Sequence, residues 1–179
     1  MRAALALIVS TLALMPSPAA IAQDSAAIAA TEAACGPKDV KFDVKNVHSQ
    51  PSAEQPETGK ALVYVIQDMG NAKCIGCPAT TRVAMDGAWM GANHKSSYLS
   101  FAVSPGEHHL CADWQSGFEA LSPIVGLAHF SAEAGRIYYF RTRMFGNTSE
   151  ILFDLDPIDS DLGKFFVASK PLSVSHPKK

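Results

Sequence analysis

The sequence has no apolar run long enough to cross a membrane as a helix. Its longest such run, residues 3–15, holds about 13 residues, whereas a membrane-spanning helix needs about 20. No cluster of Lys and Arg is long enough to follow a phosphate backbone, and the formal net charge of the chain is −2. Nucleic acid is therefore not expected as a partner.

Known catalytic patterns are missing as well. The chain has no Gly-x-Ser-x-Gly elbow, and no set of its residues has the types and spacing of a known catalytic site. We therefore expect a protein that is not an enzyme, with no catalytic residues, no cofactor and no metal site.

The first residues are typical of a signal peptide. Arg2 supplies a short positive start, the apolar run follows, and Ala20-Ile21-Ala22 has the small residues of a cleavage site. We expect cleavage after Ala22 and a secreted or periplasmic mature protein without a transmembrane segment. A lipid anchor is not expected, because Cys35 lies well downstream of the apolar run and the residues before it make a poor lipobox.

Four cysteines in an exported chain are most simply two disulfides, for which the sequence permits three pairings. We predict that Cys74 bonds Cys77, because Gly76 lies between them and the short ring closes with little loss of chain entropy. Cys35 and Cys111 are then paired by subtraction. Their bond would attach the N-terminal leader to the domain.

The Cys74-Ile75-Gly76-Cys77 motif leaves two other functions open. A redox dithiol needs its first cysteine at a helix N-terminus, whereas residues 78–82 lead into a predicted strand. A zinc site would have to recruit two further ligands, such as Cys111 and His109. A structural disulfide is the favoured interpretation, and a thiol-disulfide oxidoreductase that uses Cys74 and Cys77 is the rival function.

Hydrophobic patterning predicts a series of short strands. Residues 40–44 alternate apolar and polar side chains, and residues 61–66 form a continuous apolar run that suits a strand covered on both faces at the centre of a sheet. Asp86-Gly87 separates two short strands and favours a type I′ hairpin, because both positions tolerate positive φ.

Later turns predict further pairs of strands. Residues 98–103 and 108–114 flank Ser104-Pro105-Gly106, so the second of these strands is expected to return beside the first. Residues 127–133 and 136–144 flank Ala134-Gly135 and predict a second hairpin. Residues 151–155 make the last expected strand, and the apolar spacing of residues 158–168 predicts a short helix, capped by Asp159 or Ser160.

Some eight short strands separated by turns indicate a mainly β protein, either a sandwich or a small barrel. We predict an Ig-like antiparallel β-sandwich with a short C-terminal helix. Residues 1–22 are the signal peptide, residues 23–58 a leader with the first strand and a linker, and residues 59–179 the sandwich domain.

Five residues are candidates for ligand binding. Trp89, Tyr98 and Trp114 could be exposed aromatics on which a sugar ring stacks, although core packing is the alternative for at least one Trp. Arg141 and Arg143 share a strand face with Tyr139 and form either a small anion site or a solvated surface.

Histidines and aspartates give weaker signals. His108 and His109 are adjacent on a strand, so they face opposite sides and cannot chelate one ion together; one is expected to be half-buried and the other exposed. The aspartates of residues 154–161 lack the Gly and Glu of an EF-hand loop, so calcium is not expected.

Several segments in a fixed order resemble a known family. The segments are residues 61–65, residues 83–91, residues 97–108 and residues 132–140, which include Asp86-Gly87 and Ser104-Pro105-Gly106-Glu107-His108. Over about residues 60–156 the chain resembles the bacterial domain of unknown function 2846 and, more distantly, PEGA-type β-sandwich repeats. The resemblance implies an exported β-sandwich without an established activity. We expect a non-enzymatic binding or interaction module of the cell envelope, with an envelope protein or a saccharide as partner.

Overall fold

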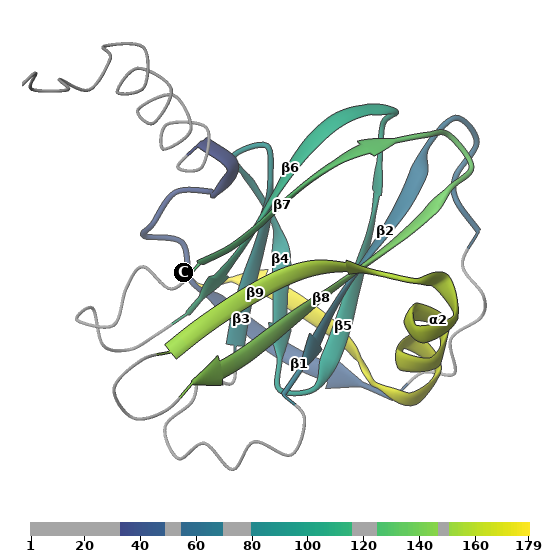
Figure 1. Cartoon of the computed structure of the whole chain (residues 1–179). Coiled ribbons are helices and arrows are strands. Elements are labelled where there is room, and N and C mark those ends of the chain that lie inside the picture. Colours follow the sequence, from purple (N-terminus) through teal and green to yellow (C-terminus); the bar gives the residue numbers. More distant parts are fainter. Residues whose placement is uncertain (1–32, 49–54, 70–79, 116–124, 147–150) are drawn as a thin grey trace, which may run out of the picture.

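The computed structural model describes residues 33–48, 55–69, 80–115, 125–146 and 151–179 (Figure 1). The expected signal peptide and the Cys74–Cys77 pair lie outside these residues. The elements, in chain order, are β1 (Phe42–Val47), β2 (Ala61–Asp68), β3 (Thr80–Met85), β4 (Ala88–His94), β5 (Ser97–Val103), β6 (Gly106–Trp114), β7 (Val125–Ala132), β8 (Ile137–Gly146), β9 (Ile151–Ile158), α2 (Ser160–Ser169) and β10 (Leu172–Pro177).

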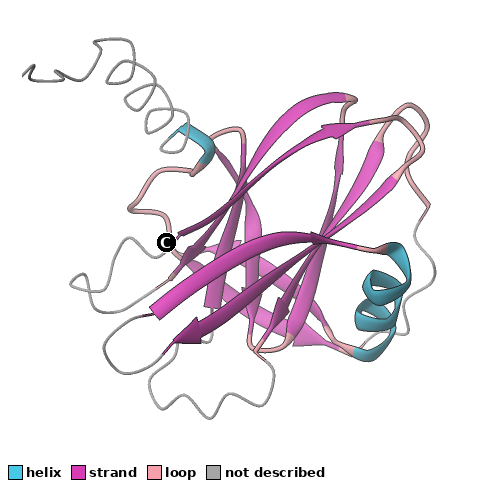
Figure 2. Ribbon diagram, in the orientation of Figure 1, coloured by secondary structure: helices cyan, strands magenta, loops and turns pink. Residues whose placement is uncertain are grey.

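The strands form two sheets that pack as a sandwich, and α2 lies against the outer face of the larger one (Figure 2). The six-stranded sheet has the order β1-β10-β5-β2-β8-β9, and the four-stranded sheet has the order β4-β3-β6-β7. The predicted mainly β sandwich with a C-terminal helix is confirmed. It is not wholly antiparallel, since β2 pairs with β8, and β10 with β5, in parallel.

The core lies between the sheets. Its buried side chains are Ala61, Val63, Val65, Val83, Leu99, Val103, Leu110, Ala112, Ala132, Phe140, Phe153 and Leu155. The sheets approach closely along one side, where a Cβ on Gly126 of β7 would lie 2.9 Å from the backbone N of Leu155 in β9. Along the opposite side, the Ala92 N–H of β4 donates to the Ser175 hydroxyl of β10 over 3.0 Å.

β2 is the central strand that its apolar run predicts. Val63 and Val65 face the four-stranded sheet, whereas Leu62, Tyr64 and Ile66 face outward into a second cluster, which Val167 of α2 covers. Tyr64 stacks on Tyr139 of β8 there, with ring centroids 5.2 Å apart. Full burial of a large aliphatic side chain stabilises the fold by about 1.5–3 kcal/mol, so a run covered on both faces fixes the middle of the sheet.

The predicted hairpin at Asp86-Gly87 is also confirmed. Asp86 has φ 51° and Gly87 has φ 82°, and the turn joins β3 to β4, which pair antiparallel. Positive φ at both central residues is the condition for a type I′ turn. The cap prediction holds as well, because Asp159 accepts hydrogen bonds from the backbone N–H groups of Asp161 and Leu162 at the start of α2.

Two predicted strand pairs are wrong. β6 does not return beside β5 but pairs with β3 and β7 in the other sheet, and β7 and β8 also belong to different sheets. The turns at Ser104-Pro105-Gly106 and Ala134-Gly135 reverse the chain as expected. A turn does not decide whether the next strand pairs with the previous one or crosses the core, since either course buries the inward apolar face.

β10 was not predicted from the sequence, so β9 is not the last strand. The inward residues of β10 are polar: Ser173 contacts Ser97 through its hydroxyl and donates to Asn46, while Ser175 accepts from Ala92. Outward Val174 is 40% exposed. This inverts the usual apolar-in pattern. β1 pairs with β10, so the sandwich includes a strand that was predicted to precede the domain of residues 59–179.

Candidate functional site

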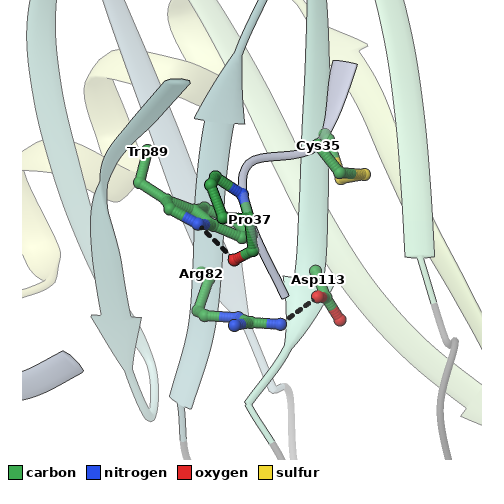
Figure 3. The surroundings of a disulfide bond; sticks show 6 residues. Cys35, Pro37, Arg82, Trp89 and Asp113 are labelled. Atoms are coloured by element: carbon green, nitrogen blue, oxygen red, sulfur yellow. Dashed lines mark hydrogen bonds and ion pairs between the residues drawn. A yellow bond between two sulfur atoms is a disulfide. The ribbon is translucent and has the colours of Figure 1, made fainter. Parts of the chain in front are cut away.

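The N-terminal segment, residues 34–40, lies over the outer face of the four-stranded sheet (Figure 3). Cys35 is bonded to Cys111 in the middle of β6, with the two Cα atoms 5.1 Å apart, as predicted. Beside this disulfide the Gly87 N–H donates to the Ala34 carbonyl over 3.1 Å. The segment is therefore fastened by one covalent bond and by the turn of the β3–β4 hairpin.

Trp89 of β4 is half-buried beneath the same segment. Its Nε1–H donates to the Pro37 carbonyl over 2.9 Å, and the Arg82 guanidinium lies 4.5 Å from the centroid of its ring (Figure 3). A Cβ on Gly36 would lie 2.5 Å from Nε1, so only glycine allows the backbone to pass this close to the indole.

Arg82 and Asp113 form a buried ion pair below the indole (Figure 3). Their side chains are 8% and 11% exposed. Arg82 Nη1 also donates to the carbonyls of Lys38 and Val40, so the guanidinium joins β3, β6 and the N-terminal segment. Burial raises the pKa of the Asp113 carboxyl, and the charge and hydrogen bond of Arg82 offset that rise in part.

Gln115, just after β6, holds the start of β1. Its side-chain amide accepts from the Phe42 N–H over 2.6 Å and donates to the Phe42 carbonyl over 2.9 Å. The amide thus forms the two hydrogen bonds to Phe42 that the backbone of a neighbouring strand would otherwise form. The polar groups around the N-terminal segment bind backbone, which favours a structural role over bond-making chemistry.

Of the two alternatives for the aromatic residues, the structure shows packing for Tyr98 and Trp114. Tyr98 is 4% exposed beneath α2 and Trp114 is 6% exposed, so neither presents a ring face to solvent. Trp89 is covered by Pro37 and Arg82. Trp89 lies beneath the N-terminal segment and Tyr98 beneath α2, where the large apolar area of each ring favours packing.

Arg141 and Arg143 lie on the outer face of the six-stranded sheet, as their alternation with Phe140 predicts. Oδ2 of Asp68 lies 4.0 Å from Nη1 of Arg141, and Oδ2 of Asp156 lies 2.9 Å from Nη2 of Arg143. Arg141 also lies over the Phe166 ring of α2 at 6.0 Å. These carboxylates offset the positive charge, so the solvated, ion-paired surface is observed rather than a site with surplus charge for an anion.

The predicted division of His108 and His109 is confirmed, because His108 is half-buried and His109 is exposed. Nδ1 of His108 lies 2.7 Å from Asp86 Oδ2, and Nε2 lies 2.8 Å from the Ser104 carbonyl. Burial alone would lower the pKa of His108, but the bonds to Asp86 and Ser104 and the nearby carboxylates raise it. Both ring nitrogens face acceptors, which favours the imidazolium.

The His108 contact predicts a pH-dependent contribution to stability. A raised pKa in the folded state means that the contribution is present below the unfolded value and is lost as the pH rises through the folded value. His108→Gln should lower the free energy of unfolding by about 1 kcal/mol near pH 6 and by much less near pH 9, after allowance for solvent screening of exposed Asp86. Urea unfolding at both pH values measures this, with His176→Gln as control. An equal loss at the two pH values would contradict it.

The remaining candidates have structural partners or lie elsewhere. Asp154 and Asp156 face Arg143, and Asp159 caps α2. Among the described residues, no group of three or more His, Cys, Asp or Glu side chains is arranged to hold a metal ion. No helix in the described part of the chain is long and apolar enough to cross a membrane.

Arg82 and Asp113 are site residues that were not predicted from the sequence. Arg82 begins the predicted strand 82–85 and is followed by three apolar residues, and Asp113 lies between Ala112 and Trp114 in the predicted strand 108–114. Buried charges are rare unless they are paired, so two such charges on separate strands were a usable signal.

Comparison with models of protein families, with curated proteins and with solved structures found no match to this chain. The resemblance to the bacterial domain of unknown function 2846 and to PEGA-type repeats therefore stays a prediction from the quoted motifs.

Proposed function

We propose that this protein is an exported, non-enzymatic β-sandwich that serves as a binding or interaction module of the bacterial cell envelope. The observation that carries the proposal is the disulfide between Cys35 and Cys111. Disulfides form and persist in oxidising compartments, and this one fastens the segment that follows the expected signal peptide.

The engagement of polar side chains supports a binding role over catalysis. Arg82 and Asp113 neutralise each other in a buried pair, and His108 is held between Asp86 and Ser104. The His94 ring contacts the Thr80 hydroxyl over 3.0 Å. These four side chains, which could otherwise serve as acid or base, are held by contacts with the strands and the N-terminal segment.

Export is tested by expression of the full chain in a bacterium, followed by fractionation and N-terminal sequencing. We expect a periplasmic or secreted protein whose first residue is Gln23, with the Cys35–Cys111 bond formed. A matched chain without residues 1–22 should stay in the cytoplasm. Recovery of the full chain in the cytoplasm with Met1 retained would contradict the proposal.

The rival oxidoreductase is tested on the exported protein. Thiol titration should find no free thiol, and the protein should not accelerate reduction of a small-molecule disulfide over the rate without protein. Cys74→Ser is the matched variant and should give the same rate. Turnover by the wild type that Cys74→Ser abolishes would replace the binding module with a thiol oxidoreductase.

A further inference from the structure

Two exposed histidines face each other across β6 and β7. His109 is opposite His129 in the strand register, and the centroids of their rings are 4.8 Å apart. The His109 N–H donates to Asp86 Oδ1, and the His109 carbonyl accepts from the Asp86 N–H. The His109 backbone therefore points away from β7, which makes this a non-hydrogen-bonded pair, the kind in which opposed side chains are closest.

Glu107 supports the pair from the same face of β6. Its Oε2 atom lies 2.7 Å from Nε2 of His129, and the side chains of His129 and Glu107 are 56% and 61% exposed. In a neutral imidazole this contact places the ring proton on Nε2 and leaves a lone pair on Nδ1. Histidines that bind metals commonly donate their other ring N–H to a carboxylate in this way.

We propose that His109 and His129 together bind a divalent transition-metal ion, with Cu²⁺ bound more tightly than Ni²⁺ or Zn²⁺. Imidazole nitrogen suits all three ions, and Cu²⁺ stands highest in the general order of affinity for such ligands. The strands hold both rings close together on the surface, so binding of the second nitrogen costs little additional conformational entropy. Water fills the other coordination positions, because the pair supplies two nitrogens and no third ligand is gathered among the described residues.

Neighbouring histidines are unsuited to the same role. Both ring nitrogens of His108 are engaged, by Asp86 and by Ser104, and its ring packs 5.6 Å from that of Phe130. Nδ1 of His94 contacts the Thr80 hydroxyl. This makes the assignment specific to one pair and gives the experiment its controls.

The test is calorimetric titration of the purified protein with Cu²⁺, Ni²⁺ and Zn²⁺ salts, one ion at a time. We expect one Cu²⁺ per chain at this site. His109→Gln and His129→Gln should each raise the dissociation constant at least tenfold, and the double variant should be little worse than either, because the two nitrogens act as a unit. Glu107→Gln should weaken binding about tenfold through the orientation of His129.

His176→Gln is the matched control, since His176 is an exposed histidine on β10 in the other sheet. It should leave the affinity unchanged. Thermal unfolding without metal checks that the variants fold, and Cu²⁺ should selectively broaden the NMR signals of the His109 and His129 rings. Unchanged affinity in His109→Gln or His129→Gln, or an equal loss in His176→Gln, would overturn the assignment.

Discussion

Cys35→Ser is expected to lower the melting temperature by about 10 °C. The disulfide joins residues 76 apart in sequence, so its loss gives the unfolded chain a large loop of new freedom. By the chain-entropy relation this bond stabilises the protein by roughly 4 to 5 kcal/mol at most. Residual structure in the unfolded chain lowers that stabilisation. A domain of this size shifts by about 2–4 °C per kcal/mol.

The variants Cys35→Ala, Cys111→Ala and their double combination separate chain entropy from local packing. If the cross-link carries the effect, the double variant should melt near the single ones. Cys77→Ser is the contrasting variant and should change the melting temperature little, because its predicted bond closes a short ring. The expectation fails if Cys35→Ser melts within 2 °C of the wild type, or if a peptide map under non-reducing conditions links Cys35 to Cys74 or Cys77.

Arg82→Met is expected to destabilise the protein by about 3–5 kcal/mol at neutral pH. The change leaves the Asp113 carboxylate buried without its partner and removes the donor to the Lys38 and Val40 carbonyls. An unpaired buried charge costs far more than the net value of the pair, since it loses its hydration without compensation. Urea unfolding measures the loss.

The matched control is the double variant Arg82→Met/Asp113→Leu, which should be more stable than Arg82→Met alone because it leaves no buried charge. The loss of stability in Arg82→Met should also become smaller at acidic pH, because burial raises the pKa of the Asp113 carboxyl and protonation removes its charge. A double variant less stable than Arg82→Met would show that the pair acts mainly through its hydrogen bonds to the N-terminal segment.

Release of the N-terminal segment gives Arg82→Met a second readout. Arg82 holds two carbonyls of the segment and lies over Trp89, so Trp89 fluorescence and proteolysis near Lys38 should both change before global unfolding. Lys164→Met, a substitution on the exposed face of α2, should change neither. Unaltered proteolysis at Lys38 would mean that the disulfide and the hydrogen bonds of Gly87 and Trp89 hold the segment without Arg82.

Local physical chemistry determined several elements from the sequence alone. The apolar run of β2 has no polar face to present to water, so both of its faces had to be buried, as in a central strand. Asp86-Gly87 tolerates positive φ at two successive positions, and Asp159 can accept from the free N–H groups of a helix start. Cys35 and Cys111 were paired by elimination, and the structure contains that bond.

Tertiary structure alone decided the assignment of strands to sheets and the partners of the polar residues. A turn such as Ser104-Pro105-Gly106 reverses the chain in the same way for a hairpin and for a crossover. The serines of β10 point inward because they form hydrogen bonds there with Asn46, Ala92 and Ser97. Those three residues come from three other strands.

The same limit applies to the sites. The burial of Trp114, the pairing of Arg82 with Asp113 and the approach of His109 to His129 each depend on residues far apart in the chain. Periodicity shows which way a side chain faces. It does not show what lies opposite, because that is set by strand register, and register is the outcome of burying the whole core at once.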